Sequence, residues 1–255
     1  MRPIWIIAKM SILENSRKQV FHVLCLLMLA LIAGSTLLSI FTEGVQLKIL
    51  KDLCMTSILF GGAVLAIALG SVGIPNDVES RTIYPIFARP ISRAQYVAGK
   101  FLGTMLTVSM GVVVMAVLFG VLIASYQGGF DAYLLLAVGF TLIEVCVIAA
   151  ISTTISVVAS PAITAVLTFM IYICGTVKIA YFAGLIDRAT NGSAKVVYLA
   201  IYHLLPNLEC FNLKTALVHH DCVPVSYLVQ VAVYGLAYSA FILFLGTLRF
   251  ARKEV

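Results

Sequence analysis

Six long apolar runs constrain the fold of this chain more than any other feature of its sequence. They cover residues 20–41, 53–74, 100–125, 132–157, 162–185 and 227–248. Each run is long enough for an α-helix to cross a bilayer, which takes about 20 residues. A helix satisfies its own backbone hydrogen bonds in lipid, which an open strand does not. The runs therefore predict an all-α polytopic membrane protein with six transmembrane helices in one domain, residues 1–255.

The composition excludes a water-soluble domain. Of the 255 residues, 62% are hydrophobic and 11% are charged, against about 45–50% and about 25% in soluble domains. The net charge of +6 does not indicate nucleic-acid binding, because basic residues beside membrane spans arise from orientation and from anionic headgroups. The expected partner is the lipid bilayer and not a nucleic acid.

Lys and Arg are distributed unequally between the two sides of the predicted membrane. One side receives Arg2, Lys9, Arg17, Lys18, Arg81, Arg89, Arg93, Lys100, Arg249, Arg252 and Lys253. The short connection between spans three and four has no basic residue, and most basic residues on its side fall in or beside one long loop, where the positive-inside rule is weak. The rule predicts cytoplasmic N- and C-termini in the inner (plasma) membrane of the cell.

Residues 3–18 precede the first span with the pattern of an amphipathic helix. Its polar face holds Ser11, Glu14, Asn15 and Lys18, and its apolar face holds Ile6, Met10 and Leu13, with Trp5 beside them. The pattern favours a helix at the cytoplasmic interface, and a plain extension of the first span is the alternative. The segment is not typical of a cleavable signal peptide, because the first apolar run exceeds the ~7–15 residues of such a signal. We expect it to be retained.

The segment PNDVESRTIYPIFARPISRAQYVAGK, residues 75–100, holds the densest charge in the chain and lies between spans two and three. Ser92 is followed three residues later by Gln95, a capping-box signature that predicts a helix beginning at Arg93 and continuing into the third span. Pro85 and Pro90 interrupt the chain before this helix.

Residues 77–84 of this segment are expected to form a short helix, with Asp77 near its positive N-terminal end. Apolar contact surface comes from Ile83, Tyr84, Ile86 and Phe87. Exposed charge beside exposed aromatic rings suits docking against a partner. A solvated loop whose arginines obey the positive-inside rule explains the residues equally well.

The segment resembles the signature of the type-2 (export) permease family of ATP-binding-cassette transporters. That signature reads roughly E-x-G-T-[LI], a few apolar residues, P-[IL]-[ST]-R, and then G-K at the next span. The matching residues are Glu79, Thr82, Ile83, Pro90, Ile91, Ser92, Arg93, Gly99 and Lys100. Arg81 departs where the family usually has glycine, and Pro85 is unusual. The six spans, the N-terminal helix and the outer stretch LLPNLECFN also look like the family.

The resemblance implies a permease without catalysis of its own, paired with a second permease copy in a homo- or heterodimer. It also implies two separate ATPase subunits, which would hold ATP and Mg while the permease binds no cofactor directly. The short helix between spans two and three would then be a coupling helix seated in a groove of the ATPase. The coupling and docking residues would be Asp77, Glu79, Arg81, Thr82, Ile83, Tyr84, Phe87 and Arg93. The substrate path is expected at the dimer interface, along parts of spans one, two and five.

Glu144 lies in the middle of the fourth predicted span. An ionisable residue at that depth is costly and usually faces a bundle interior or a cavity. Glu144 is therefore a functional candidate, and a protonated carboxyl hydrogen-bonded to a neighbouring helix is the alternative.

The outer segment before the last span is long, and its apolar stretch KVVYLAIYHLLP is too short to cross the membrane. It predicts re-entrant or interfacial helices. Cys210 and Cys222 both fall on this side, where an oxidising compartment would favour a disulfide between them. Two unrelated reduced thiols are the alternative.

Two other classes of function compete with the permease. A stand-alone secondary transporter or channel would need intramembrane charged relays or broken helices in symmetric positions. An integral membrane enzyme would place its site in the outer segment, around His203, Glu209, His219, His220 and Asp221. Adjacent histidines on one helix point ~100° apart, so no metal site is expected. The chain lacks a G-x-x-x-x-G-K-[ST] phosphate loop and the H-E-x-x-H, C-x-x-C and G-x-S-x-G motifs.

Overall fold

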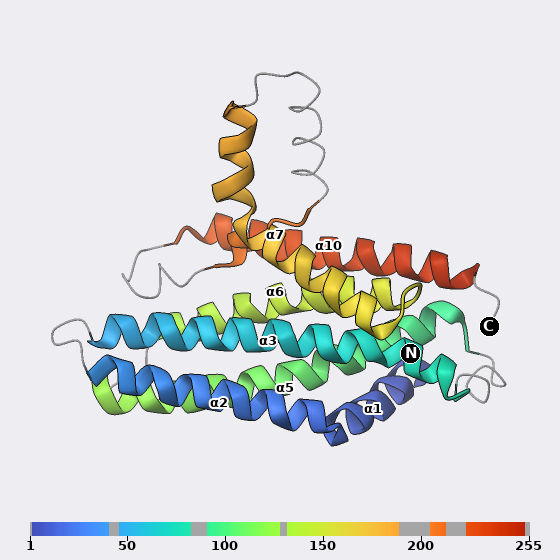
Figure 1. The fold of residues 1–255 in the computed structure, drawn as a ribbon, viewed down its shortest axis with the longest axis horizontal. Coiled ribbons are helices and arrows are strands. Elements are labelled where there is room, and N and C mark those ends of the chain that lie inside the picture. The colour runs from blue at the N-terminus through green and yellow to red at the C-terminus, as the bar shows by residue number, and fades with distance from the viewer. Residues whose placement is uncertain are drawn as a thin grey trace.

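The computed structural model describes residues 2–40, 46–82, 91–127, 132–188, 205–212 and 223–252. Nearly all of these residues are helical, and the described ranges contain no strand. The helices are α1 (Arg2–Arg17), α2 (Gln19–Ile40), α3 (Gln46–Glu79), α5 (Arg93–Gln127), α6 (Ala132–Ser156), α7 (Pro161–Arg188) and α10 (Val225–Ala251), with a short 3-10 helix η1 (Glu209–Phe211). Figure 1 shows their order along the chain.

A helix covers each of the six segments predicted as spans. Four helical stretches in the described ranges are long and apolar enough to cross a membrane, and a fifth is apolar but shorter. The four are Lys48–Glu79, Arg93–Ala124, Tyr133–Ser156 and Val225–Ala251, and the shorter one is Pro161–Val177. These findings support an all-helical, multi-pass membrane protein. The count of six spans stays a prediction.

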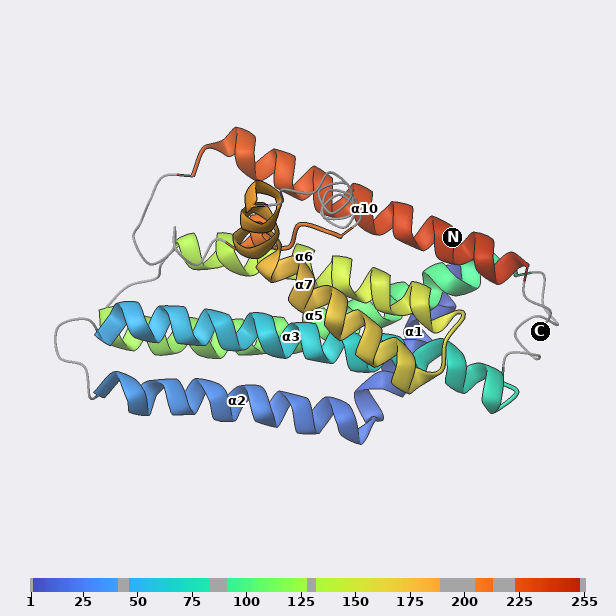
Figure 2. The ribbon, with the colours of Figure 1, turned by 45° about the horizontal axis from the view of Figure 1, so that its top comes forward.

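Helix α3 occupies the centre of the bundle and packs against α2, α5, α6 and α7. Its side chains Leu50, Ile58, Leu65 and Leu69 are buried along its length. Helix α10 packs on α6, on the side of the bundle away from α2 (Figure 2). The start of α1, the end of α3, the start of α5 and the end of α10 all lie at one end of the bundle (Figures 1 and 2).

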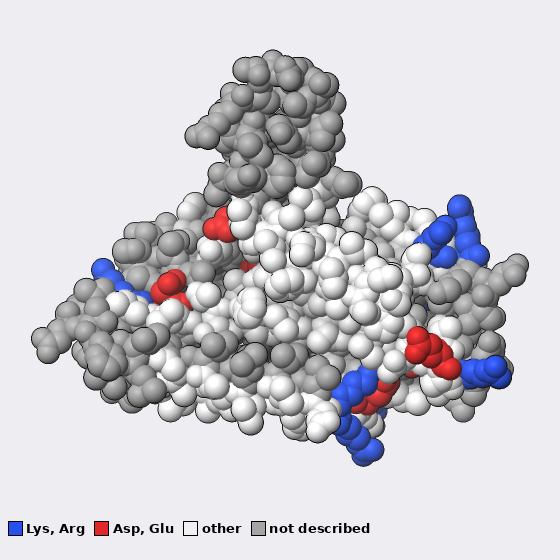
Figure 3. Space-filling model, viewed as in Figure 1, with Lys and Arg blue, Asp and Glu red and all other residues white. Residues whose placement is uncertain are grey.

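The surface has the charge pattern of a membrane protein. Charged side chains gather mainly at the two ends of the long axis, and the region between them is largely uncharged in Figure 3. Apolar side chains are exposed along the middle of the helices, such as Met110 and Val121 on α5 and Val166 on α7. Lipid tails solvate such side chains without the penalty that water would impose.

Small residues allow close contacts between α3, α6 and α10. A Cβ on Gly70 would lie 2.7 Å from Ser152 Oγ of α6, and a Cβ on Gly246 would lie 2.9 Å from Thr154 Oγ1. Ser152 Oγ donates a hydrogen bond to the Ile67 carbonyl at 3.2 Å. These contacts are typical of helix packing in membranes, where small residues let backbones approach.

Helix α3 corrects one sequence prediction. We expected Asp77 near the N-terminus of a short helix over 77–84, but α3 continues through Pro75 and ends at Glu79, so Asp77 lies in its last turn. Ile74 and Val78 flank Pro75 and pack into one apolar cluster, which holds the helical turn despite the hydrogen bond that proline lacks. The predicted coupling segment beyond Thr82, residues 83–90, lies outside the described residues.

Candidate functional site

Two glycines position α1 against α5. A Cβ on Gly99 would lie 2.8 Å from Ile7 Cβ, and a Cβ on Gly103 would overlap Ser11. The carbonyl oxygen of Ile4 would lie 3.2 Å from a Cβ on Gly99. A side chain at either position would push the helices apart, so the G99-K100 pair of the sequence signature includes a contact glycine.

This contact turns the polar face of α1 into the protein. Ser11 and Asn15 are buried, at 2% and 1% exposure, whereas Trp5 and Met10 are 61% and 62% exposed. The arrangement is the reverse of a water-soluble amphipathic helix, which buries its apolar face. It suits a helix whose outer face meets the apolar edge of a membrane.

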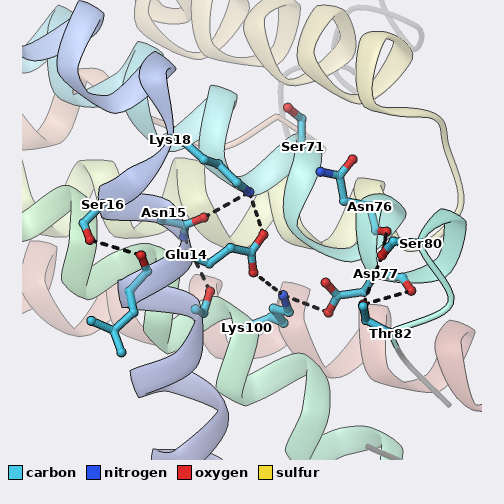
Figure 4. Close-up of polar contacts among 12 residues, drawn as sticks. Glu14, Asn15, Ser16, Lys18, Ser71, Asn76, Asp77, Ser80, Thr82 and Lys100 are labelled. Atoms are coloured by element: carbon cyan, nitrogen blue, oxygen red, sulfur yellow. Dashed lines mark hydrogen bonds and ion pairs between the residues drawn. The ribbon is translucent and has the colours of Figure 1, made fainter. Parts of the chain in front are cut away.

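A buried lysine links three helices at this end of the bundle. Lys100 Nζ of α5 lies 2.8 Å from Asp77 Oδ2 of α3 and 3.3 Å from Glu14 Oε2 of α1. Lys18 Nζ lies 2.9 Å from Glu14 Oε1, and Figure 4 shows Lys100 between the two carboxylates. The Tyr96 hydroxyl donates a hydrogen bond to Asp77 Oδ2 at 2.6 Å. We call these five residues the junction.

The formal charges of the junction balance, because two carboxylates face two ammonium groups. Lys100 and Asp77 have side chains only 7% and 10% exposed. Removing one partner of such a buried pair leaves an uncompensated charge, which typically costs ~3–5 kcal/mol. Burial by itself would raise the pKa of the Glu14 carboxyl, but Lys100 and Lys18 beside it hold that pKa below its ordinary value.

The start of α5 also binds the end of α10. Arg93 Nη1 donates hydrogen bonds to the carbonyls of Phe250 at 3.0 Å and Ala251 at 3.3 Å. The Arg93 guanidinium lies 5.9 Å from the centre of the Phe250 ring, which stacks on Tyr96 at 5.7 Å. A cation at these terminal carbonyls satisfies groups that the helix leaves unpaired. Arg93, predicted to dock on the ATPase, is thus engaged within its own chain.

The predicted capping box is confirmed. The Gln95 amide donates to Ser92 Oγ at 3.2 Å, and the Ser92 amide donates to Gln95 Oε1 at 3.1 Å. Two otherwise unpaired amides are satisfied reciprocally, and α5 begins at Arg93 as expected. The chain that enters α5 therefore has a fixed direction.

Arg81 adopts a backbone conformation that favours glycine. Its φ is 57°, and it is the one non-glycine residue with positive φ in the described part of the chain. Its amide donates to the Val78 carbonyl at 3.2 Å, and Thr82 Oγ1 donates to the Asp77 carbonyl at 3.4 Å. This left-handed residue ends α3 as a C-terminal glycine commonly does. The glycine of the family signature thus has a physical reason, and Arg81 meets the same requirement at a cost of ~1–2 kcal/mol.

A groove of about 800 Å³ opens beside the junction. One wall comes from α1 and the other from the end of α3, with Ile91 just before α5 and Lys100 in its second turn. Of the predicted docking residues, Asp77, Glu79 and Thr82 line it. Ile83, Tyr84 and Phe87 lie outside the described residues.

Sequence reasoning missed the pairing that organises this site. Glu14 was assigned only to a polar helix face, Tyr96 was not singled out, and Lys100 was only a signature residue. The signals were present in part, since a buried polar helix face and a lysine at a span boundary both need partners. Their distance along the chain concealed the contact, because 86 residues separate Lys100 from Glu14.

The remaining candidates lie elsewhere. Glu144 is 1% exposed within α6. The Cys210 thiol donates a hydrogen bond to the Asn207 carbonyl at 2.9 Å, and Cys222 lies outside the described residues, so their disulfide stays a prediction.

Of the residues of the rival outer site, only Glu209 is described, and its carboxylate accepts a hydrogen bond from Asn212 Nδ2 at 3.2 Å. His203, His219, His220 and Asp221 lie outside the described ranges. Among described residues, no group of three or more His, Cys, Asp and Glu is placed to hold a metal.

The outer stretch around η1 packs back onto the helices. Leu208 and Phe211 are buried, and a Cβ on Gly235 of α10 would lie 2.9 Å from the Phe211 ring. The Asn207 amide donates to the Tyr234 hydroxyl at 2.9 Å, and the Tyr227 hydroxyl donates to the Cys210 carbonyl at 3.0 Å. The described part of LLPNLECFN is therefore a structural contact between η1 and α10.

The comparison with protein families agrees with the signature residues. The sequence model of one family, described as ABC-2 family transporter protein, matches residues 5–255. A comparison with curated proteins gave no match. The match covers nearly the whole chain, from α1 to the end of α10, and so includes both the signature segment and the junction. The chain therefore belongs to the ABC-2 family of transporter proteins.

Proposed function

We propose that this chain is the membrane-spanning permease subunit of an export-type ATP-binding-cassette transporter, coupled to separate ATPase subunits that hold ATP and Mg²⁺. The observation that carries the proposal is the junction. The signature residue Lys100 of α5 meets Asp77 of α3 and Glu14 of α1 there, at the end of the bundle where α3 ends and α5 begins. Membership of the family supports the transporter class.

The contacts at this end suggest how a push on the docking segment would reach the spans. Arg81 and Thr82 fix the direction in which the chain leaves α3, and the Ser92 capping box fixes its entry into α5. Lys100 joins α5 to α3 and α1, and Arg93 joins α5 to α10. A displacement of the segment would therefore act on four helices together. In this proposal Arg93 contributes to coupling by joining α5 to α10 within the chain, and not by contacting the ATPase.

The wider assembly belongs to the same proposal. Two permease copies would enclose the substrate path, each with six spans and cytoplasmic termini in the inner membrane. The placement of the start of α1, the end of α3 and the end of α10 at one end of the bundle supports this topology. Glu144 would face the bundle interior at mid-depth.

Site-specific photocrosslinking tests the docking surface directly. A photoreactive amino acid at Ser80, which is exposed beside the groove, should crosslink to a co-expressed ATPase subunit. The same amino acid at Lys48, which is exposed at the opposite end of α3, should not. Equal crosslinking from both positions, or none from Ser80, would contradict the proposal.

The rival classes make different predictions. Substrate movement in vesicles that contain this chain but no ATPase would favour a stand-alone transporter or channel. Loss of function on replacing His219 and His220, without any recoverable ATPase, would favour an outer-side enzyme.

A further inference from the structure

The end of α10 carries two arginines beside a small cavity. A cavity of about 260 Å³ lies between the ends of α6 and α10, lined by Val157, Val158, Arg249 and Arg252. The described lining is therefore two cations and two apolar side chains, without a carboxylate among these four residues. Figure 3 shows basic side chains at the end of the molecule where α10 ends.

Neither arginine is neutralised within the described residues. Among the described residues, neither Arg249 nor Arg252 takes part in an ion pair. The last carbonyls of α10, which cations commonly satisfy, already accept hydrogen bonds from Arg93. Both guanidinium groups are exposed, and no described carboxylate pairs with them.

An apolar stripe leads along α10 to these arginines. Phe241, Leu245 and Leu248 recur at the three- and four-residue spacing that places side chains on one helix face, and their exposures are 59%, 43% and 48%. Arg249 follows Leu245 by four residues, and Arg252 follows Leu248 by four. The same face is therefore apolar along the span and cationic at its end.

We propose that this face binds an anionic phospholipid, with its phosphate between Arg249 and Arg252 and an acyl chain along the apolar stripe. Arginine forms short, paired hydrogen bonds with phosphate, and basic pockets between membrane helices bind anionic headgroups. The exposed Val158, at 59%, gives the cavity an apolar edge where the glycerol backbone begins. The proposal rests on the membrane topology and not on coupling to an ATPase.

Native mass spectrometry of the whole chain in mild detergent provides the test, with phosphatidylglycerol and phosphatidylcholine as probes. The wild type should retain phosphatidylglycerol in preference to phosphatidylcholine. The double variant Arg249→Gln/Arg252→Gln should weaken phosphatidylglycerol binding ~30-fold, since each basic residue contributes ~1 kcal/mol to anionic lipid binding. Val158→Phe keeps both charges but fills the cavity, and it should also weaken binding.

The matched control is Lys9→Gln/Arg17→Gln. It removes two exposed charges from α1 at the same end of the bundle but leaves the cavity intact. Because neither Lys9 nor Arg17 lines the cavity and neither can pair with a phosphate bound there, its affinity for phosphatidylglycerol should stay within about threefold of the wild type. An equal loss in the control would overturn the site, because net charge would then explain the binding. Inorganic phosphate that displaces the lipid at millimolar concentration, or wild-type protein without lipid preference, would also overturn it.

Discussion

The junction and the centre of the bundle hold helices together by different means. At the junction, Lys100 joins α1, α3 and α5 through charges, although Gly99 and Gly103 also bring backbones close. In the centre, α3 meets α6 at Gly70 and Ser152, and α10 meets α6 at Gly235 and Ile143. The junction lies at one end of the bundle, and ion pairs suit that position because charges at mid-membrane are costly. Close backbone contacts make the centre rigid, whereas ion pairs at the junction can rearrange when the docking segment moves.

Removing the central cation should produce the largest effect. Lys100→Met leaves Asp77 buried beside Tyr96 without its ion pair and weakens the hold on Glu14. We expect a loss of ~3–5 kcal/mol in the free energy of unfolding, measured by denaturation in detergent micelles. Adding Asp77→Asn to this variant removes the uncompensated charge and should recover a large part of the loss. A double variant as unstable as Lys100→Met would contradict the ionic description.

The centre should respond to volume and not to charge. Gly70→Ala places a Cβ 2.7 Å from Ser152 Oγ, whereas a Cβ on Gly73 of the same helix meets no atom within 4 Å. Overpacking typically costs ~1–3 kcal/mol, so Gly70→Ala should lower the unfolding temperature while Gly73→Ala leaves it unchanged or raises it. Equal effects from the two alanines would show that α3 and α6 can shift apart freely.

Breaking the link between α5 and α10 should have an effect of intermediate size. Arg93→Gln removes the charge that satisfies the Phe250 and Ala251 carbonyls, and hydrogen bonds to charged groups contribute ~1.5–3 kcal/mol. Hydrogen exchange in the last turn of α10 should accelerate, while exchange in the middle of α6 should not. Unaltered exchange at the end of α10 would contradict the role of Arg93 as a link between α5 and α10.

Replacing Arg81 with the glycine of the family signature should have the smallest effect. Unlike Lys100→Met, Gly70→Ala and Arg93→Gln, it should raise the free energy of unfolding. Arg81→Gly removes the Cβ that makes the left-handed backbone conformation unfavourable at this position, and it should stabilise the chain by ~1 kcal/mol. Thermal unfolding measures the gain, and Arg81→Ala, which keeps the Cβ, is the control. A stabilisation of equal size in the alanine variant would assign the effect to the lost charge.

The sequence predicted most of the helices but not how their charged residues pair. Apolar runs of sufficient length determine a membrane helix locally, so α2, α6 and α7 begin and end within a few residues of expectation. The Ser92–Gln95 cap is equally local and gave the start of α5 correctly. Local rules failed at the end of α3, where one helix continues through Pro75 to Glu79 in place of the expected separate helix over 77–84. Ile74 and Val78 pack there in one apolar cluster, a tertiary contact that local rules do not include.

Some members of the candidate site were predictable from the sequence, but their contacts were not. The signature marked Glu79 and Lys100, and the family resemblance added Asp77 as a docking residue, yet spacing alone did not place Glu14 against Lys100 or Arg93 against α10. Such pairs depend on how α1 folds back onto α5, which two glycines and the buried face of α1 determine together. Arg81 shows the reverse case, in which a mismatch with the family signature acquires a physical meaning only from its φ angle.

Co-purification tests the central claim most directly. The chain should be expressed with the ATPases encoded by neighbouring reading frames and purified in mild detergent, as wild type, Glu79→Arg and Asp52→Arg. Glu79 is exposed beside the groove, whereas Asp52 is exposed near the opposite end of α3 and serves as the matched charge reversal. We predict a stable ATPase complex for wild type and Asp52→Arg, and at least a tenfold lower ATPase yield for Glu79→Arg, equivalent to ~1.4 kcal/mol. No ATPase with the wild type, or equal yields from both variants, would contradict a permease that couples at this end of the bundle.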